Sequence, residues 1–207
     1  MLSIYDIKPR FQDVLRPLVA RLAAAGVSAN AVTLLAMGIS VAIGVALVLL
    51  NPGPAAYLVL PLWLFLRMAL NAIDGMLARE HGQKSTLGAY LNELTDVISD
   101  AALYLPFAFV APFGGLSVGA VIWLAAVSEM AGALGPMVGA SRRYEGPMGK
   151  SDRAFVFGAL GLWLGLAGGL PAWSSWLMPL VALLIVLNII NRVRAGLAEI
   201  HAQEKQG

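Results

Sequence analysis

Oxygen-bearing side chains interrupt an otherwise apolar sequence between residues 71 and 100. They fall at intervals of three or four residues, which place side chains on one face of a helix, in two groups: Asn71 and Asp74, then Asn92, Asp96 and Asp100. Carboxylate and carboxamide oxygens are the ligands that a hard cation such as Mg²⁺ takes, often together with phosphate oxygens and water. Such an ion holds a diphosphate and neutralises the charge that develops on it during a displacement. The stretch therefore predicts a metal-dependent site for a diphosphate.

Two glycines and two arginines accompany these oxygens. Gly75 and Gly88 let two backbones, or a backbone and a flat ligand, approach closely. Arg79 can bind a phosphate through two parallel hydrogen bonds, and Arg67 lies four residues before Asn71, about one turn deeper. The alternative to a ligand site is a helix pair held by interhelical hydrogen bonds and a buried ion pair.

The elements that must position these residues are six apolar windows, each compatible with a bilayer-spanning helix of about 20 residues. They cover residues 29–50, 54–73, 95–111, 117–141, 154–170 and 172–191. The chain is 59% hydrophobic and 13% charged, whereas soluble domains are about 25% charged. We therefore expect an all-α polytopic membrane protein with six transmembrane helices. The second and third helices, as antiparallel neighbours joined by a short loop, would bring the two polar groups together.

Basic residues predict the orientation of these helices. Thirteen of the fourteen Lys and Arg residues lie in the termini and in the two loops that share one side of the membrane, and the opposite loops have none. Cytoplasmic loops carry the excess of basic residues, so both termini and the polar site are expected at the cytoplasmic face. The chain contains no cysteine, which excludes disulfides and thiolate chemistry.

The chain divides into three segments. Residues 1–28 place apolar side chains at helical spacing and basic ones on other faces, as in an amphipathic helix that lies in the membrane interface; a solvated arm is the alternative. Residues 29–194 are expected to form the six-helix membrane domain, and residues 195–207 a cytoplasmic tail. The short connections leave no room for a separate soluble domain.

From Asn71 to Asp96 the sequence resembles the signature of the CDP-alcohol phosphatidyltransferase family, D-x2-D-G-x2-A-R-x8-G-x3-D-x3-D. Six of its eight fixed positions match in type and spacing, namely Asp74, Gly75, Ala78, Arg79, Gly88 and Asp96. The sequence Ser-Ala-Asn-Ala-Val-Thr at residues 28–33 is similar to the T-P-N-x-V-T sequence before the family's first span. Helix capping alone would also explain Asn30 and Thr33. Six spans with cytoplasmic ends are the plan of this family as well.

The resemblance implies a transferase in which an alcohol displaces CMP from a CDP-activated substrate, at a two-metal site with Mg²⁺ or Mn²⁺. Carried over by position, Asp96 is the general base on the acceptor hydroxyl and a metal ligand, and Asp74 is a retained metal carboxylate. The cytidine diphosphate pocket would be formed by Asn30, Thr33, Gly75, Ala78, Arg79 and Gly88. Members commonly form homodimers, so the resemblance also implies a homodimer here.

Asn71 and Asn92 stand where the signature has its first and third Asp. A carboxamide oxygen is neutral and does not bridge two cations as a carboxylate does, so binding of a divalent ion should weaken. One explanation has the two amide oxygens bind a weaker or single ion. A second has Asp100 or Glu93 replace the lost carboxylates, unless Arg67 neutralises Asp100 as a buried pair. In the third, the chain binds a CDP-lipid without turning it over.

The loop between the fourth and fifth windows carries basic residues on the same side as the signature, which are Arg142, Arg143, Lys150 and Arg153. We expect them to form a rim that binds the phosphate of an acceptor such as a polyol phosphate, with simple determination of topology as the alternative. Serine and unphosphorylated polyols stay open as acceptors. Glu129, within the fourth window, either pairs with Arg67 or lines the cavity.

These observations predict a transferase of phospholipid synthesis that moves a phosphatidyl group from CDP-diacylglycerol to a small alcohol and releases CMP. The reverse assignment, with a CDP-linked alcohol as donor and diacylglycerol as acceptor, uses the same chemistry. The alternative from another class is a catalytically weak or inactive CDP-lipid-binding protein that acts as a partner in a lipid-synthesis complex. A solute transporter is disfavoured because the polar groups gather at one rim, and no nucleic-acid partner is expected. In a bacterium, the protein would lie in the inner membrane.

Overall fold

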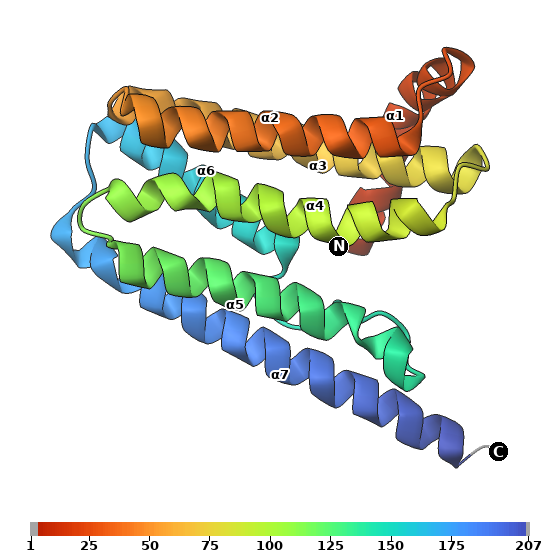
Figure 1. Ribbon diagram of the computed structural model, residues 1–207. Coiled ribbons are helices and arrows are strands. Elements are labelled where there is room, and N and C mark those ends of the chain that lie inside the picture. Colours follow the sequence, from red (N-terminus) through yellow and green to blue (C-terminus); the bar gives the residue numbers. More distant parts are fainter. Residues whose placement is uncertain (1–3, 206–207) are drawn as a thin grey trace.

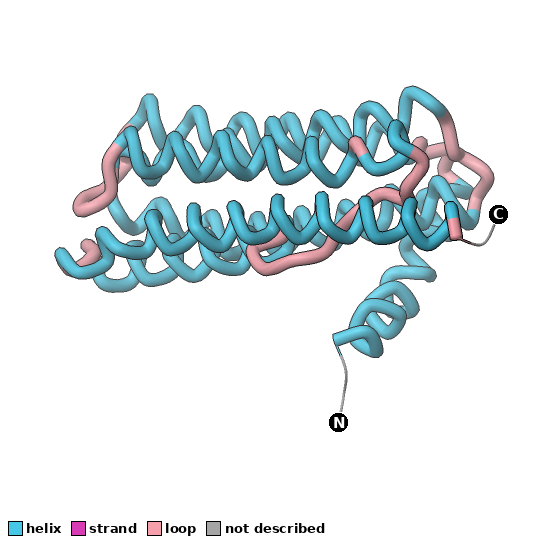
Figure 2. The backbone as a smooth tube through the Cα atoms, turned by 90° about the horizontal axis from the view of Figure 1, so that it is seen from below, coloured by secondary structure: helices cyan, strands magenta, loops and turns pink. Residues whose placement is uncertain are grey.

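Residues 4–205 are described by the computed structural model, and they fold into α-helices joined by short loops and 3-10 helices (Figures 1 and 2). The α-helices are α1 (Ile4–Ala24), α2 (Ala29–Leu50), α3 (Val59–Glu80), α4 (Thr86–Tyr104), α5 (Gly115–Ala133), α6 (Lys150–Ala167) and α7 (Leu177–Glu204). Short 3-10 helices cover Pro54–Leu58, Leu105–Phe109, Gly135–Val138 and Ala172–Trp176. The predicted all-α class is confirmed for this part of the chain.

The long helices α2 to α7 run side by side, with most of their connecting loops at the two ends of the bundle, while the loop before α6 runs back along it (Figures 1 and 2). α2 packs against both α3 and α4, α3 packs against α6, and α5 packs against α7. The pair α5 and α7 diverges from the other helices toward the C-terminus, and α6 begins midway along α4 (Figure 1). The N-terminal helix α1 stands at the end of the bundle where α2 begins.

Local sequence sets the helix ends nearest the polar stretch. Ser28 precedes α2 and accepts a hydrogen bond from the backbone N–H of Ala31 (3.1 Å), and Ser85 precedes α4 and accepts one from the N–H of Gly88 (2.9 Å). Side-chain oxygens at these positions satisfy N–H groups that have no partner inside the helix. Helix α2 is therefore capped by Ser28 and not by Asn30, which removes capping as the explanation of Asn30.

Two predicted windows differ from the helices that form. α4 begins nine residues before the window 95–111, because Ser85 starts the helix while the window followed hydrophobicity alone. α5 ends at Ala133, well before the end of the window 117–141, because Pro136 cannot continue a helix. In addition, α7 continues through Glu204, so most of the segment expected as a tail is helical.

Four helical segments of the described chain are long and apolar enough to cross a membrane. They are Ala29–Leu50, Pro54–Glu80, Gly115–Ala133 and Ala172–Glu204. α4 and α6 are long helices too, but charged residues interrupt their apolar sequence, such as Asp96 and Asp100 in α4 and Lys150 and Arg153 in α6. The six helices α2 to α7 thus lie where six spans were expected, and four of them belong to segments with the composition of a span.

Apolar packing holds the bundle together in two clusters. In the larger one the rings of Tyr104 on α4 and Phe157 on α6 stack with their centroids 3.8 Å apart. The smaller one joins α1, α2 and α3 around Val19, which is fully buried. An ion pair between Arg16 and Glu80 (2.5 Å) adds to the contact of α1 with α3. The amphipathic segment is helical as predicted, and its position at a membrane interface stays a prediction.

Candidate active site

The polar faces of α3 and α4 meet, as the spacing predicts. The side-chain amide of Asn71 on α3 donates a hydrogen bond to Oδ1 of Asp96 on α4 (3.3 Å), and the guanidinium of Arg67 donates to the same oxygen (3.1 Å). Asp96 follows Thr86, the first residue of α4, by ten residues, which puts it about 15 Å along the helix. The meeting point therefore lies within the bundle and not at its outer edge.

Asp74 is tied to α2 through the short sequence that precedes the first predicted span. The hydroxyl of Thr33 donates a hydrogen bond to Oδ2 of Asp74 (2.7 Å), and both residues are buried. At the start of the same helix, Asn30 faces Gly88: a Cβ atom on Gly88 would lie 2.9 Å from Oδ1 of Asn30. A side chain at position 88 would therefore push Asn30 aside. Three helices thus bring both parts of the family signature to one place.

The remaining residues expected to bind the nucleotide or the metal do not all lie at this place. The guanidinium of Arg79 lies over Gly75, because both of its terminal nitrogens are 3.0 Å from where a Cβ of Gly75 would be. Ala78 instead packs against the apolar cluster between α1, α2 and α3. Asn92, expected as a metal ligand, lies on an exposed part of α4.

Both carboxylate oxygens of Asp96 are engaged. Oδ1 accepts hydrogen bonds from Arg67 and Asn71, and Oδ2 accepts one from Nζ of Lys150 (2.5 Å). The side chain of Asp96 is 11% exposed and that of Lys150 is 34% exposed. Lys150 is the first residue of α6, and it reaches Asp96 because α6 begins midway along α4 (Figure 1).

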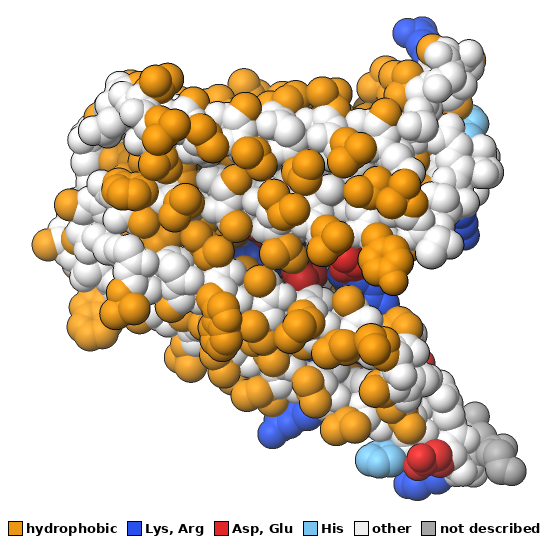
Figure 3. Space-filling model, viewed as in Figure 1, with side chains coloured by type: hydrophobic (Ala, Val, Ile, Leu, Met, Phe, Trp, Pro, Cys, Tyr) orange, Lys and Arg blue, Asp and Glu red, His pale blue; other side chains and the backbone are white. Residues whose placement is uncertain are grey.

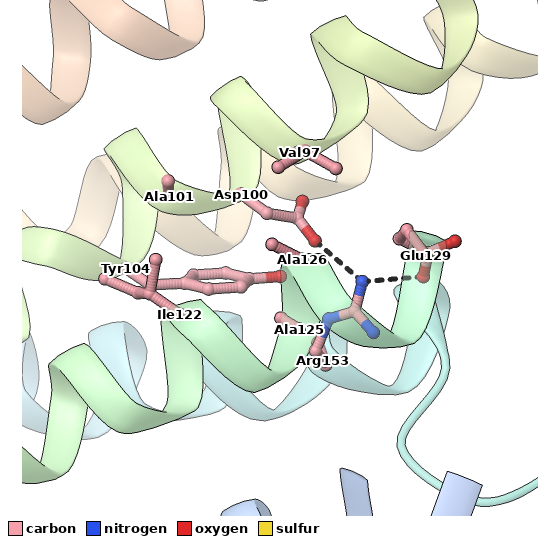
Figure 4. Close-up of a pocket in the computed structure, with 9 residues that line it drawn as sticks. All are labelled: Val97, Asp100, Ala101, Tyr104, Ile122, Ala125, Ala126, Glu129 and Arg153. Carbon is pink, nitrogen blue, oxygen red and sulfur yellow. Dashed lines mark hydrogen bonds and ion pairs between the residues drawn. The ribbon is translucent and has the colours of Figure 1, made fainter. Parts of the chain in front are cut away.

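A series of buried ion pairs continues from Asp96 into the bundle. Arg67 also pairs with Asp100 (2.6 Å), and Arg153 joins Asp100 to Glu129, with 3.0 Å for each contact (Figure 4). Asp100 therefore pairs with Arg67, which was the alternative to its being a metal ligand, and its second oxygen is held by Arg153. Buried charges persist in an apolar interior when they are paired in this way.

A small cavity beside these ion pairs is lined by residues that include Tyr104, Glu129 and Arg153 (Figure 4). Its volume is about 10 Å³, which is the space of a single water molecule. The cavity is therefore far too small for a substrate. Glu129 lines this small space, and the expected pair with Arg67 does not form, because its partners are Arg142, Arg153 and Arg192.

Arg153 lies elsewhere than the sequence predicts. It was expected at an exposed rim, but its side chain is 1% exposed and is enclosed by Asp100 and Glu129. The reason is the depth at which α6 begins: since Lys150 already lies level with Asp96, the first turn of α6 is inside the bundle. Arg153 therefore serves the interior ion pairs.

Arg142 and Arg143 hold the loop between α5 and α6 against neighbouring helices. Arg142 donates two hydrogen bonds to Glu93 on α4 (2.6 and 2.5 Å) and lies 4.3 Å over the ring of Tyr144. Arg143 pairs with Glu145 in the loop and with Glu199 on α7. Partial burial opposes the charge of Arg142, but the carboxylate of Glu93 outweighs this and raises the pKa of Arg142. Glu93, a candidate replacement ligand, is thus engaged by an arginine.

Three further residues of the interior escaped the sequence analysis. Arg192 on α7 is buried, donates to the carbonyl oxygen of Ser128 (2.5 Å) and pairs with Glu129 (3.4 Å). Asn188 accepts a hydrogen bond from the hydroxyl of Ser128 (2.8 Å) and donates one to the carbonyl of Pro147 (2.9 Å). The signal was the four-residue interval between Asn188 and Arg192, the same interval that marked the residues of α4.

The donor set suits one divalent ion better than two. Among residues 4–205, no three His, Cys, Asp or Glu side chains come together as a metal site. The carboxylates of Asp74 and Asp96 remain, and Asn71, whose amide nitrogen donates to Asp96, offers a neutral oxygen as a further donor. A divalent ion bound there would need phosphate oxygens of a ligand to complete its coordination. The site therefore fits a single ion that arrives with, or is held by, a diphosphate.

The charged residues are visible from one side of the molecule. In the space-filling view, acidic and basic side chains appear in the groove between α4 and α5, and hydrophobic side chains cover the surface on both sides of it (Figure 3). Polar groups at the floor of an apolar groove suit a ligand with a charged head and apolar chains.

Known proteins are similar to this chain in sequence and in fold. The chain is 43% identical over 196 residues to the inner membrane protein YnbA of Escherichia coli strain K12, covering 95% of this chain and 97% of that protein. The solved structure of phosphatidylinositol phosphate synthase (PgsA1) from Mycobacterium tuberculosis with CDP-DAG bound is similar with a TM-score of 0.71 and 22% identity. That match covers 87% of this chain and 92% of the other.

The same synthase in complex with manganese and citrate is similar with a TM-score of 0.68 and 21% identity, covering 87% of each chain. These solved structures share the fold of this chain. The family model for CDP-alcohol phosphatidyltransferase matches residues 26–190, which include every helix from α2 to the middle of α7. This chain belongs to the CDP-alcohol phosphatidyltransferase family.

Proposed function

We propose that this chain transfers a phosphatidyl group from CDP-diacylglycerol to a small alcohol and releases CMP. The observation that carries the proposal is the convergence of Thr33 with Asp74, and of Asn71 with Asp96, from three helices. A CDP-lipid donor is supported by the fold shared with a synthase solved with CDP-DAG bound. The apolar groove with a charged floor between α4 and α5 has the character that such a lipid requires (Figure 3).

Residues from the starts of α2 and α4 would bind the nucleotide. Asn30 lies close against Gly88, so the two residues would form one side of the pocket for cytidine. A glycine there presents a flat surface to a base or ribose. Arg79, which lies exposed at the end of α3, would bind the diphosphate.

Asp96 would accept the proton of the acceptor hydroxyl. The alcohol oxygen forms a bond to the phosphorus atom that is linked to diacylglycerol, and the bond from that phosphorus to the oxygen of CMP breaks. CMP leaves with the bonding electrons, and the hydroxyl proton moves to a carboxylate oxygen of Asp96. A positioned carboxylate speeds such a step by about 10² to 10⁴-fold.

Asp74 and the amide oxygens of Asn71 and Asn92 would hold a divalent ion such as Mg²⁺ or Mn²⁺, and Asp96 would join them as a ligand once Lys150 has moved away from it. When bound, the ion neutralises charge on the diphosphate. Thr33 keeps one oxygen of Asp74 oriented through its hydrogen bond of 2.7 Å, as partners of metal ligands commonly do. The role of Asn92 requires a change of side-chain position, because that residue is exposed.

We further propose that all six helices from α2 to α7 cross a bacterial inner membrane, with both termini and the site on the cytoplasmic side. The basic loops support this orientation, and the similarity to an inner membrane protein of E. coli supports the location. A homodimer is proposed from the family resemblance alone.

Release of CMP from CDP-diacylglycerol tests the proposed transferase. Purified protein would be assayed with Mg²⁺ or Mn²⁺ and a panel of phosphorylated and unphosphorylated alcohols. We expect CMP release with at least one acceptor, and a loss of about 10² to 10⁴-fold in Asp96→Asn, which keeps the shape of the side chain and removes the base. Lack of turnover with every acceptor would contradict the proposal.

The second candidate is a CDP-lipid-binding protein without turnover. It is favoured by the engagement of both oxygens of Asp96 and by the loss of two signature carboxylates at Asn71 and Asn92. Saturable binding of a cytidine nucleotide without CMP release across the panel would support this candidate.

A further inference from the structure

Lys150 differs from the other basic residues of the expected acceptor rim in the partner that it holds. Arg142 is paired with Glu93, and Arg143 with Glu145 and Glu199. None of these carboxylates belongs to the family signature. Lys150, in contrast, is paired with Asp96, the residue proposed to receive the proton.

Of the two cationic side chains that contact Asp96, Lys150 is the one that can move away. The other cation, Arg67, is 4% exposed and is fixed by a second contact with Asp100. Lys150 is 34% exposed and ends in an ammonium group on a flexible stem of four carbons. A group that enters from the surface can therefore reach Lys150 without disturbing the buried ion pairs.

We propose that Lys150 blocks Asp96 until an anionic acceptor releases it. A phosphate group on the acceptor carries up to two negative charges and three acceptor oxygens, so it competes for the ammonium group more strongly than a single carboxylate does. Once Lys150 turns to that phosphate, Oδ2 of Asp96 becomes available to the acceptor hydroxyl. The inference rests on the proposed transferase function and names its acceptor class, a phosphorylated alcohol.

The chemistry of the step is unchanged by this release. The acceptor oxygen bonds to the phosphorus linked to diacylglycerol, the bond from that phosphorus to CMP breaks, and the hydroxyl proton goes to Oδ2 of Asp96. What changes is when the base is available. Water and neutral alcohols do not displace Lys150, so the CDP-lipid is protected from hydrolysis in the absence of the correct acceptor.

The first test uses the unaltered protein, CDP-diacylglycerol and a matched pair of acceptors, glycerol 3-phosphate and glycerol. We expect kcat/KM for glycerol 3-phosphate to exceed that for glycerol by about tenfold or more, and inorganic phosphate to stimulate CMP release with glycerol. Stimulation follows because phosphate occupies Lys150 and frees Asp96. Absence of stimulation overturns the release, and this measurement needs no variant to fold.

The second test compares Lys150→Gln with Lys150→Arg. Lys150→Gln should raise kcat for glycerol and for hydrolysis by water, by about tenfold or more where the base is the limiting group, while KM for glycerol 3-phosphate rises. Lys150→Arg keeps the charge and should keep water hydrolysis low. Lys84→Gln is the matched control, because Lys84 is exposed between α3 and α4 and the change removes the same charge from the same side.

The outcomes separate the inference from the function on which it rests. If Lys150 only bound the acceptor phosphate or supported the fold, Lys150→Gln would lower or leave unchanged the rates with glycerol and water, and the inference would be wrong. If the unaltered protein released no CMP with any acceptor, the transferase function itself would be wrong.

Discussion

Asp96 and Asp100 lie one turn apart on α4, yet their surroundings give them different roles. Asp100 is held by two buried arginines, Arg67 and Arg153. Asp96 shares Arg67 but has the partly exposed Lys150 as its second cation. The same residue type at the same interval therefore yields one carboxylate of the interior and one that a substrate can reach.

At the residue scale, the hydrogen bond from Thr33 to Asp74 predicts a graded effect on the site. Thr33→Val keeps the shape of the side chain and removes the donor, so Asp74 loses the group that orients it. We expect Mn²⁺ affinity in the presence of CDP, and CMP release with it, to fall by about 10 to 100-fold. Thr33→Ser retains the hydroxyl and should stay close to the unaltered protein; equal losses in both variants would contradict the argument.

Restoring the signature carboxylates should strengthen metal binding. The double change Asn71→Asp and Asn92→Asp adds two negative charges near Asp74, and the number of charged ligands sets the affinity of such sites. We expect the Mn²⁺ dissociation constant, measured by titration with CDP present, to fall by about tenfold or more. Asn51→Asp at the far end of α2 is the control, and an unchanged affinity in the double variant would show that the charge argument is wrong.

At the scale of elements, ion pairs connect the helices that carry the site. Arg153 on α6 links Asp100 on α4 to Glu129 on α5, and Arg192 extends the contact to α7. Four helices therefore meet through charged side chains in a region where apolar packing would be the rule. Their relative positions depend on these pairs being complete.

Removing the central arginine should destabilise the bundle. Arg153→Met leaves Asp100 and Glu129 each with one fewer cation in the interior, which costs about 3 kcal/mol of unfolding free energy or more. Thermal unfolding in detergent should show a clearly lower midpoint. Arg194→Met removes an exposed arginine of α7 and serves as the control; similar midpoints for the two variants would contradict the prediction.

The crossing of α2 and α4 offers a second test at this scale. A Cβ atom on Gly44 would collide with the backbone carbonyl of Ala102, whereas one on Gly38 of the same helix would meet open space. Gly44→Ala should therefore cost about 1–3 kcal/mol through overpacking, while Gly38→Ala should be neutral or slightly stabilising. The two midpoints of thermal unfolding, measured in one detergent, give the comparison.

Much of this arrangement could be predicted from the sequence, because the intervals between polar residues show which side chains share a helix face. The intervals of α3 and α4 predicted that Asn71 and Asp96 would meet, and they do. The burial of Arg153 could not be predicted, since it depends on α6 starting deep beside α4. The contact of Lys150 with Asp96 has the same origin, because the sequence does not show how deep in the bundle a helix begins.

At the scale of the whole molecule, the absence of native cysteine makes the proposed orientation directly measurable. Single cysteines would be placed by Lys84→Cys, in the loop between α3 and α4, and by Ser175→Cys, at the opposite end of the bundle. In intact cells a membrane-impermeant maleimide should label position 175 only, and labelling of position 84 should require permeabilised membranes. The reverse pattern would show that the site faces away from the cytoplasm.

The charges shared between α4 and α6 bear on how the chain enters a bilayer during synthesis. Neither helix is among the segments whose length and composition suit a membrane span. Of the cations that pair with Asp96 and Asp100, only Arg67 precedes α4, and the others, Lys150 and Arg153, emerge some fifty residues later. In the six-span arrangement proposed above, the insertion machinery would have to retain α4 until α6 arrives. A chain cut after α5 would then be a poorly integrated fragment, prone to degradation, even though every apolar segment in it is intact.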